Sequence, residues 1–137
     1  TQRFQVVELQ HNFTYLTGKV RQLPVVNGGT KIAADLAQMM RPRILEYVEL
    51  ISEASQQKLK LDRLPEDPTT LAYLVAISLQ VNAADKQKLL EKVGIPEMLA
   101  YEAHLLSREI LFTRYMINTQ ADVLALNAGP TGYIFPN

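Results

Sequence analysis

Apolar side chains recur at spacings of three and four residues along most of the chain, which is typical of helices that bury one face. The first such stretch runs from Lys31 to about Ser55, and Pro42 is expected to kink or split it near Met40. A second begins at Pro68, because Asp67 can accept from the free N–H groups of the first turn and proline suits position N1. The pattern therefore predicts mainly helical structure.

Residues that typically begin or end helices divide the rest of the helical region. Asn82 is a candidate N-cap with Asp85 three residues later, and Gly94 is expected to end that helix in the left-handed conformation. Pro96 fits the first turn of a long helix that continues to about Asn118. The helices from Lys31 onward are expected to form an antiparallel bundle. Its predicted core residues are Leu71, Leu74, Leu90, Leu99, Leu106 and Ile110.

The first part of the chain has a different pattern, rich in β-branched and aromatic residues. Arg3 to Gln10 is predicted to be a strand, His11-Asn12 a turn, and Thr14 to Leu23 a second strand. Together they make a hairpin. Because unpaired strand edges recruit other chains, we expect these strands either to mediate self-association or to be poorly ordered.

These elements predict an α+β fold that is mainly α: a short β-hairpin followed by a four-helix bundle with one long helix. The predicted divisions are a hairpin segment over 1–26, a helical bundle over 27–118 and a tail of uncertain structure over 119–137. Apolar residues in that tail allow the long helix to continue to Asn127 or Gly129, after which the residues Gly-Pro-Thr-Gly are expected to break it.

The amino-acid composition argues against several classes of function. The 137 residues carry 14 basic and 14 acidic side chains, so no net charge favours nucleic acid or an anionic membrane as a partner. There is no cysteine, which excludes thiolate chemistry and fits a reducing compartment. Without a transmembrane run or a signal-peptide core, the sequence indicates a cytoplasmic protein, or one of an organelle matrix or stroma.

Candidate chemistry is sparse, and we expect neither enzyme activity nor a cofactor or metal. The sequence NGGTK from Asn27 to Lys31 lacks the spacing of a phosphate-binding loop. His11 and His104 stand without a metal-ligand spacing around them. The serines considered as nucleophiles fall within predicted helices: Ser52, Ser55, Ser78 and Ser107. Three acids on the long helix are expected to form a solvated face: Glu97, Glu102 and Glu109.

The order of these signals resembles the N-terminal, substrate-binding domain of Lon proteases. The helical part of the resemblance is carried by Asp67-Pro68, Leu71, Leu74, Ala76, Asp85-Lys86-Gln87, Leu89-Leu90-Glu91 and Leu99. Its strand part is carried by Arg3, Phe4, Val6, Glu8, Tyr15, Leu16, Val20 and Leu23. Met98 departs from the family, whose members commonly have arginine there. The resemblance implies that the hairpin is the end of a PUA-like β-barrel whose earlier strands are absent.

The resemblance also implies a non-catalytic domain that recruits unfolded or damaged protein substrates to an ATP-dependent serine protease. Self-association, or assembly within the oligomer of a parent protease, is then expected. Met39, Met40 and Tyr47, near Pro42, are the predicted substrate-protein contacts, because methionine adapts to varied apolar partners. The alternative for the methionines is that they are core residues. A structural or adaptor module that assembles with folded partners is the alternative function, and a small helical enzyme is a third class.

Overall fold

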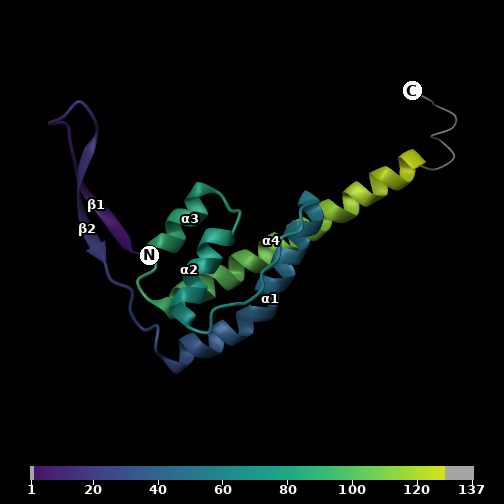
Figure 1. The fold of residues 1–137 in the computed structure, drawn as a ribbon, viewed down its shortest axis with the longest axis horizontal. Coiled ribbons are helices and arrows are strands. Elements are labelled where there is room, and N and C mark those ends of the chain that lie inside the picture. Colours follow the sequence, from purple (N-terminus) through teal and green to yellow (C-terminus); the bar gives the residue numbers. More distant parts are fainter. Residues whose placement is uncertain (1, 129–137) are drawn as a thin grey trace.

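The computed structural model describes residues 2–128, which form a two-stranded hairpin beside a body of four helices (Figure 1). The elements in chain order are β1 (Arg3–Gln10), β2 (Thr17–Leu23), α1 (Lys31–Ser55), α2 (Pro68–Ser78), α3 (Ala83–Leu90) and α4 (Ile95–Ala128). The predicted α+β, mainly α class is confirmed. The long helix continues past Asn118 through part of the expected tail, and the Gly-Pro-Thr-Gly break lies outside the described residues.

Local caps start two of the helices where the sequence predicts. The Asp67 carboxylate accepts from the Thr70 N–H at 2.9 Å at the start of α2, and the Asn82 side-chain oxygen accepts from the Asp85 N–H at 2.8 Å at the start of α3. Each cap satisfies a donor that the first turn leaves without an intrahelical partner. These starts depend on neighbouring residues alone, which is why the pattern identifies them.

Pro42 does not split α1, which is continuous from Lys31 to Ser55. Pro42 and Gln38, whose carbonyl loses its helical donor, are both exposed, so water can reach that carbonyl. The helix instead ends at Gln56, which has the left-handed backbone (φ 55°) and donates its N–H to the Glu53 carbonyl. The helix therefore ends by a left-handed cap.

Gly94 is not the left-handed residue that ends α3. The helix ends at Leu90, and no glycine within residues 2–128 has a positive φ. Gly94 is buried and forms a parallel bridge with Val26, where the Ile95 N–H donates to the Val26 carbonyl at 2.9 Å. The bridge places the segments that lead into α1 and α4 side by side.

From that bridge α1 and α4 run in the same direction (Figure 1). Arg43 donates to the Ser107 hydroxyl, and further along both helices Glu46 pairs with Arg114. The prediction of an antiparallel bundle is therefore wrong for this pair. Hydrophobic spacing identifies the buried face of a helix but not the direction in which its partner runs.

The core lies where α1, α2 and α3 pack on the first half of α4. Of the predicted core, Leu71, Leu99, Leu106 and Ile110 are buried, and Leu74 is half-buried. The prediction that Leu90 is a core residue is wrong, because its side chain is 46% exposed, whereas that of the adjacent Leu89 is 1% exposed. In Figure 1 the end of α4 projects beyond the other helices, and apolar residues in that part of α4 are exposed: Tyr115, Met116, Val123, Leu124 and Leu126.

The hairpin is antiparallel, with Arg3 paired to Leu23 and Gln10 to Thr17. The first predicted strand is confirmed, whereas the second begins at Thr17 and not at Thr14. A bulge between Val6 and Glu8 interrupts the register, so side chains do not alternate along the whole strand. Nearly every hairpin side chain is exposed except Arg3. Within residues 2–128, no helix combines the length and the hydropathy needed to cross a membrane.

Candidate functional site

A groove of about 920 Å³ separates the hairpin from α2 and α3. In Figure 1 it lies where the purple strand β1 approaches the teal helices. The volume is within the range of protein ligand sites, which run from about 300 to 1,000 Å³. Its walls come from segments that are far apart in the sequence: residues 2–6, Leu23, Tyr73, Ala76, Ile77, Lys86, Gln87, Leu89, Leu90, Glu91, Val93 and Met98.

The strand side of the groove is formed by five consecutive residues, from Gln2 to Val6. Successive side chains of a strand point to opposite faces, so a run of both parities means that the groove follows the edge of β1. Among the described residues β1 pairs only with β2. The strand wall of the groove therefore lies at the start of β1, next to Leu23 at the end of β2.

Apolar side chains make up much of the exposed wall. Phe4 is 62% exposed on the strand side, and Ile77 and Val93 are 72% and 68% exposed on the helical side. Val6 and Leu90 add further exposed apolar area. Apolar side chains gathered on both sides of one groove mark a surface suited to binding another molecule.

Arg3 fastens the strand to the helical body. Its guanidinium donates to the carbonyl oxygens of Leu90 at 3.0 Å and Val93 at 3.3 Å, and also to that of Lys92. These carbonyls lie at the end of α3, where helical carbonyls lack intrahelical donors. Arg3 is only 6% exposed, and the sequence offers no signal for this role beyond its place at the start of a strand.

Lys86 is the second cation of the groove and lies on the opposite wall. Its ammonium group donates to the carbonyl of Ala76 near the end of α2. Burial lowers the pKa of Lys86, and the charge of Glu102 acts in the opposite direction. Lys86 therefore links α3 to α2 at a partly desolvated position.

Glu102 lies behind Lys86 in the core, where the sequence predicted a solvated face. Its side chain is fully buried, and neither carboxyl oxygen has a hydrogen-bond partner. Burial raises the pKa of Glu102 to about 9, while Lys86 opposes the shift. The spacing contained the correct signal, because Glu102 is three residues after Leu99 and four before Leu106 on the buried face.

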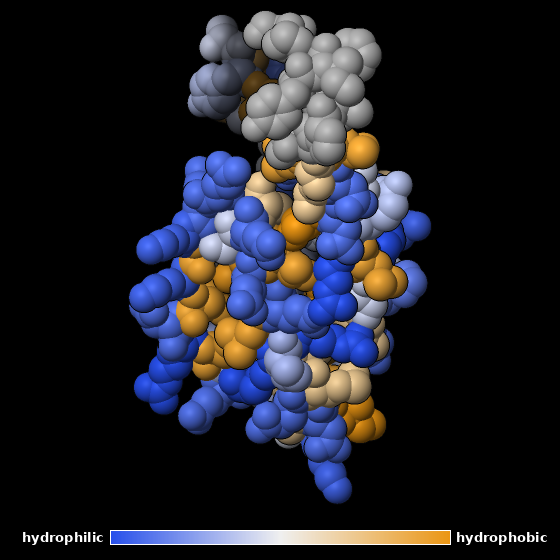
Figure 2. Space-filling view, turned by 90° about the vertical axis from the view of Figure 1, so that its right-hand side faces the viewer, coloured by the Kyte–Doolittle hydropathy of each residue, from blue (hydrophilic) through white to orange (hydrophobic). Residues whose placement is uncertain are grey.

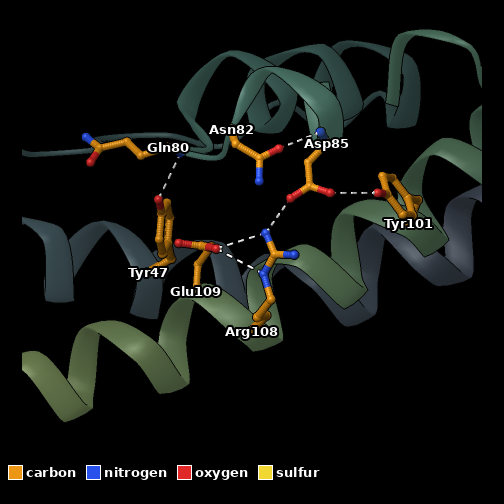
Figure 3. Close-up of polar contacts among 7 residues, drawn as sticks. All are labelled: Tyr47, Gln80, Asn82, Asp85, Tyr101, Arg108 and Glu109. Carbon is orange, nitrogen blue, oxygen red and sulfur yellow. Dashed lines mark hydrogen bonds and ion pairs between the residues drawn. The ribbon is translucent and has the colours of Figure 1, made fainter. Parts of the chain in front are cut away.

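A polar cluster ties α3 to α4 at a separate place (Figure 3). The Asp85 carboxylate accepts from the Arg108 guanidinium at 2.7 Å and from the Tyr101 hydroxyl at 3.2 Å. Arg108 also pairs with Glu109 at 3.1 Å. The hydrogen bond from Arg108 is the main cause that lowers the pKa of Asp85. Every member of this cluster has a partner, so it holds helices together and leaves no group free for chemistry.

The predicted contact residues Met39, Met40 and Tyr47 do not line the groove. Met40 and Tyr47 are core residues, at 0% and 3% exposure, and the Tyr47 hydroxyl accepts from the Gln80 N–H at 3.1 Å. Met39 is 50% exposed on the outer side of α1. Of these three residues, only Met39 has a side chain that is exposed enough for a binding partner to contact.

The serines considered from the sequence and His104 make other contacts, and His11 is exposed before β2. Ser78 and Ser107 donate to the carbonyls four residues back, at 2.8 and 2.9 Å, as helical serines commonly do. His104 stacks on Tyr101 with ring centroids 6.4 Å apart. No cluster of three potential metal-ligating side chains occurs in the part of the chain that the structure describes.

Comparison with known proteins identifies a family for most of the chain. A family model of the ATP-dependent protease La (LON) substrate-binding domain matches residues 1–108, which covers the hairpin, α1 to α3 and the first part of α4. A search of curated proteins finds no match. The chain therefore belongs to the substrate-binding domain family of the ATP-dependent Lon protease, protease La.

Proposed function

We propose that this chain captures segments of unfolded or damaged proteins for ATP-dependent proteolysis and catalyses no reaction itself. Membership of the Lon substrate-binding family supports a role in substrate recognition. The observation that carries the proposal is the groove, in which exposed apolar side chains of β1, α2 and the segment after α3 face one cavity. We place the protein in the cytoplasm or an organelle matrix, which the absence of cysteine fits.

The affinity of one such groove should be low. Covering each exposed apolar side chain contributes on the order of 1 kcal/mol, and ordering a flexible client offsets part of that gain. The dissociation constant for one copy is then on the order of micromolar or weaker. Several copies in the oligomer of a parent protease would raise the apparent affinity without new contacts.

The test is a titration of a fluorescently labelled, extended apolar peptide into the purified chain, followed by anisotropy. Ile77→Asp and Val93→Asp place a charge on the groove wall at highly exposed positions, so they should weaken binding while preserving the fold. Leu111→Asp is the matched control, because Leu111 is 67% exposed on α4 and does not line the groove. Equal loss of binding in all three variants would refute the groove as the site.

Met39 is a second, separate contact that we propose for clients, on the ground of its exposure and its adaptable side chain. Met39→Ser should then weaken peptide binding less than Val93→Asp does. NMR shifts on peptide addition would distinguish the two places, because the groove lies on the hairpin, α2 and α3 whereas Met39 lies on α1.

The alternative, an adaptor that assembles with folded partners, is favoured by the second half of α4. Leu111, Phe112, Tyr115 and Met116 are each more than half exposed. Figure 2 looks toward the end at which α4 leaves the body and shows apolar residues distributed among hydrophilic ones. A stable complex with a folded protein that Leu111→Asp abolishes, together with no peptide binding, would favour this function.

A further inference from the structure

The groove contains positive charge that no ion pair compensates. Arg3 and Lys86 line it, and neither forms an ion pair with any carboxylate among residues 2–128. Their hydrogen bonds go to backbone carbonyl oxygens, which carry no net charge. A partly desolvated cation without an anion is unfavourable, so a bound carboxylate would improve the environment of both.

Two acidic residues lie near Arg3 and Lys86, and neither neutralises the positive charge of the groove. Glu91 lines the groove but is exposed, and its carboxylate accepts from the Gln87 side chain at 3.1 Å. Glu102 forms no salt bridge with Lys86 and its carboxyl oxygens have no hydrogen-bond partner, and burial, which raises its pKa to about 9, favours the neutral form near pH 7. At neutral pH the groove therefore holds two cations against one solvated carboxylate.

The surroundings would strengthen the attraction for an incoming anion. The walls beside Lys86 are largely apolar, and a peptide in the groove would displace water from both charges. We propose that the groove binds an extended apolar client segment that carries one aspartate or glutamate side chain, whose carboxylate pairs with Lys86. This inference rests on the proposed function and adds the chemistry of the preferred client.

The experiment compares two acetylated, amidated peptides that differ only by glutamate or glutamine at the centre of one apolar sequence. The glutamate peptide should bind the wild-type chain roughly three- to tenfold more tightly, as for a partly desolvated charge pair. Added salt should reduce that ratio. Lys86→Met should abolish the preference and Lys86→Arg should retain it. Lys88→Met is the control, because Lys88 is exposed on the same helix and does not line the groove.

The outcomes separate this inference from the proposed function. Equal affinities of both peptides for the wild-type chain would overturn the charge preference and leave client binding intact. No binding of either peptide would overturn the proposed function. A glutamine peptide with a free C-terminal carboxylate that binds more tightly than the glutamate peptide would overturn the side chain as the source of the anion. If Lys86→Met does not fold, the Lys86→Arg variant and the salt dependence still decide.

Discussion

The carboxyl group of Glu102 on α4 interacts electrostatically with the ammonium group of Lys86 on α3, yet no salt bridge or hydrogen bond joins them. Lys86 directs its hydrogen bond to the Ala76 carbonyl, which leaves both oxygens of Glu102 without a partner. A buried carboxyl in this position is held neutral by desolvation. The relationship makes the stability of the domain sensitive to pH.

We predict that the free energy of unfolding decreases as pH rises from about 4.5 to about 9. The pKa of Glu102 is raised from 4.5 to about 9 in the folded chain, so between these values the folded state keeps a proton that the unfolded state has lost. The contribution of the neutral Glu102 carboxyl to the free energy of unfolding is therefore fully present below the unfolded pKa of 4.5. It is lost as pH rises to the folded pKa, by up to about 1.4 kcal/mol per pH unit.

Urea unfolding at a series of pH values checks this. Glu102→Leu should flatten the profile and raise stability above pH 7, because it removes the buried acid. Glu97→Gln on the exposed side of the same helix is the control and should leave the slope unchanged. A wild-type profile without this decline would contradict the assigned environment of Glu102.

The Asp85 cluster should show the opposite pH dependence. The hydrogen bond from Arg108 lowers the pKa of Asp85, so its contribution is present above the unfolded value of 3.8 and is lost as pH falls through the folded pKa. Asp85→Asn should therefore destabilise the chain at pH 7 and have little effect at strongly acidic pH. A double-mutant cycle with Arg108→Met measures the coupling. Arg63 and Glu66, a pair more than 80% exposed on each side, should show almost no coupling and provide the comparison.

Adjacent leucines on α3 should differ sharply in their contribution to stability. Leu89→Ala removes a side chain that is 1% exposed and should cost about 2–5 kcal/mol. Leu90→Ala changes a side chain that is 46% exposed and should cost on the order of 0.5 kcal/mol. Urea midpoints of the two variants measure the difference. Equal midpoints would mean that the buried face of α3 is assigned incorrectly.

Replacing Arg3 should release the hairpin without unfolding the helices. Arg3→Met removes the donors to the carbonyls of Leu90 and Val93, so amides of β1 and β2 should exchange faster with deuterium. Amides in the buried half of α4 should keep their protection. Arg21→Met is the control, because Arg21 is exposed and contacts only Gln5 on the neighbouring strand. Unchanged exchange in the hairpin after Arg3→Met would contradict the fastening role.

Sequence patterns correctly predicted those structural features that depend only on residues close together in the sequence. The caps at Asp67 and Asn82 and the strand composition of Arg3–Gln10 are local, and the structure confirms each. The burial of Glu102 was also encoded in its spacing, but its charge led to the wrong prediction. Polarity and periodicity conflict at such a position, and only the packed neighbours decide which prevails.

The groove could not have been predicted in the same way. Its walls come from β1, α2 and α3, and its existence depends on how closely Arg3 holds the strand to the end of α3. Met40 and Tyr47 show the converse, because adaptable apolar residues near a proline fit both a core and a contact surface. Hydrophobic spacing alone does not distinguish these two environments.

The parallel pairing of α1 and α4 determines how the chain can fold. The contact between Glu46 and Arg114 joins residues 68 positions apart, and that between Arg43 and Ser107 joins residues 64 apart. Helices that pair through a short connection meet early, whereas these two meet only after α2 and α3 have been made. During synthesis on a ribosome, the part of the apolar face of α1 that α4 covers therefore stays exposed until α4 has been made. A nascent chain of this substrate-binding family therefore exposes an apolar helix face before its fold is complete, which is a state prone to aggregation.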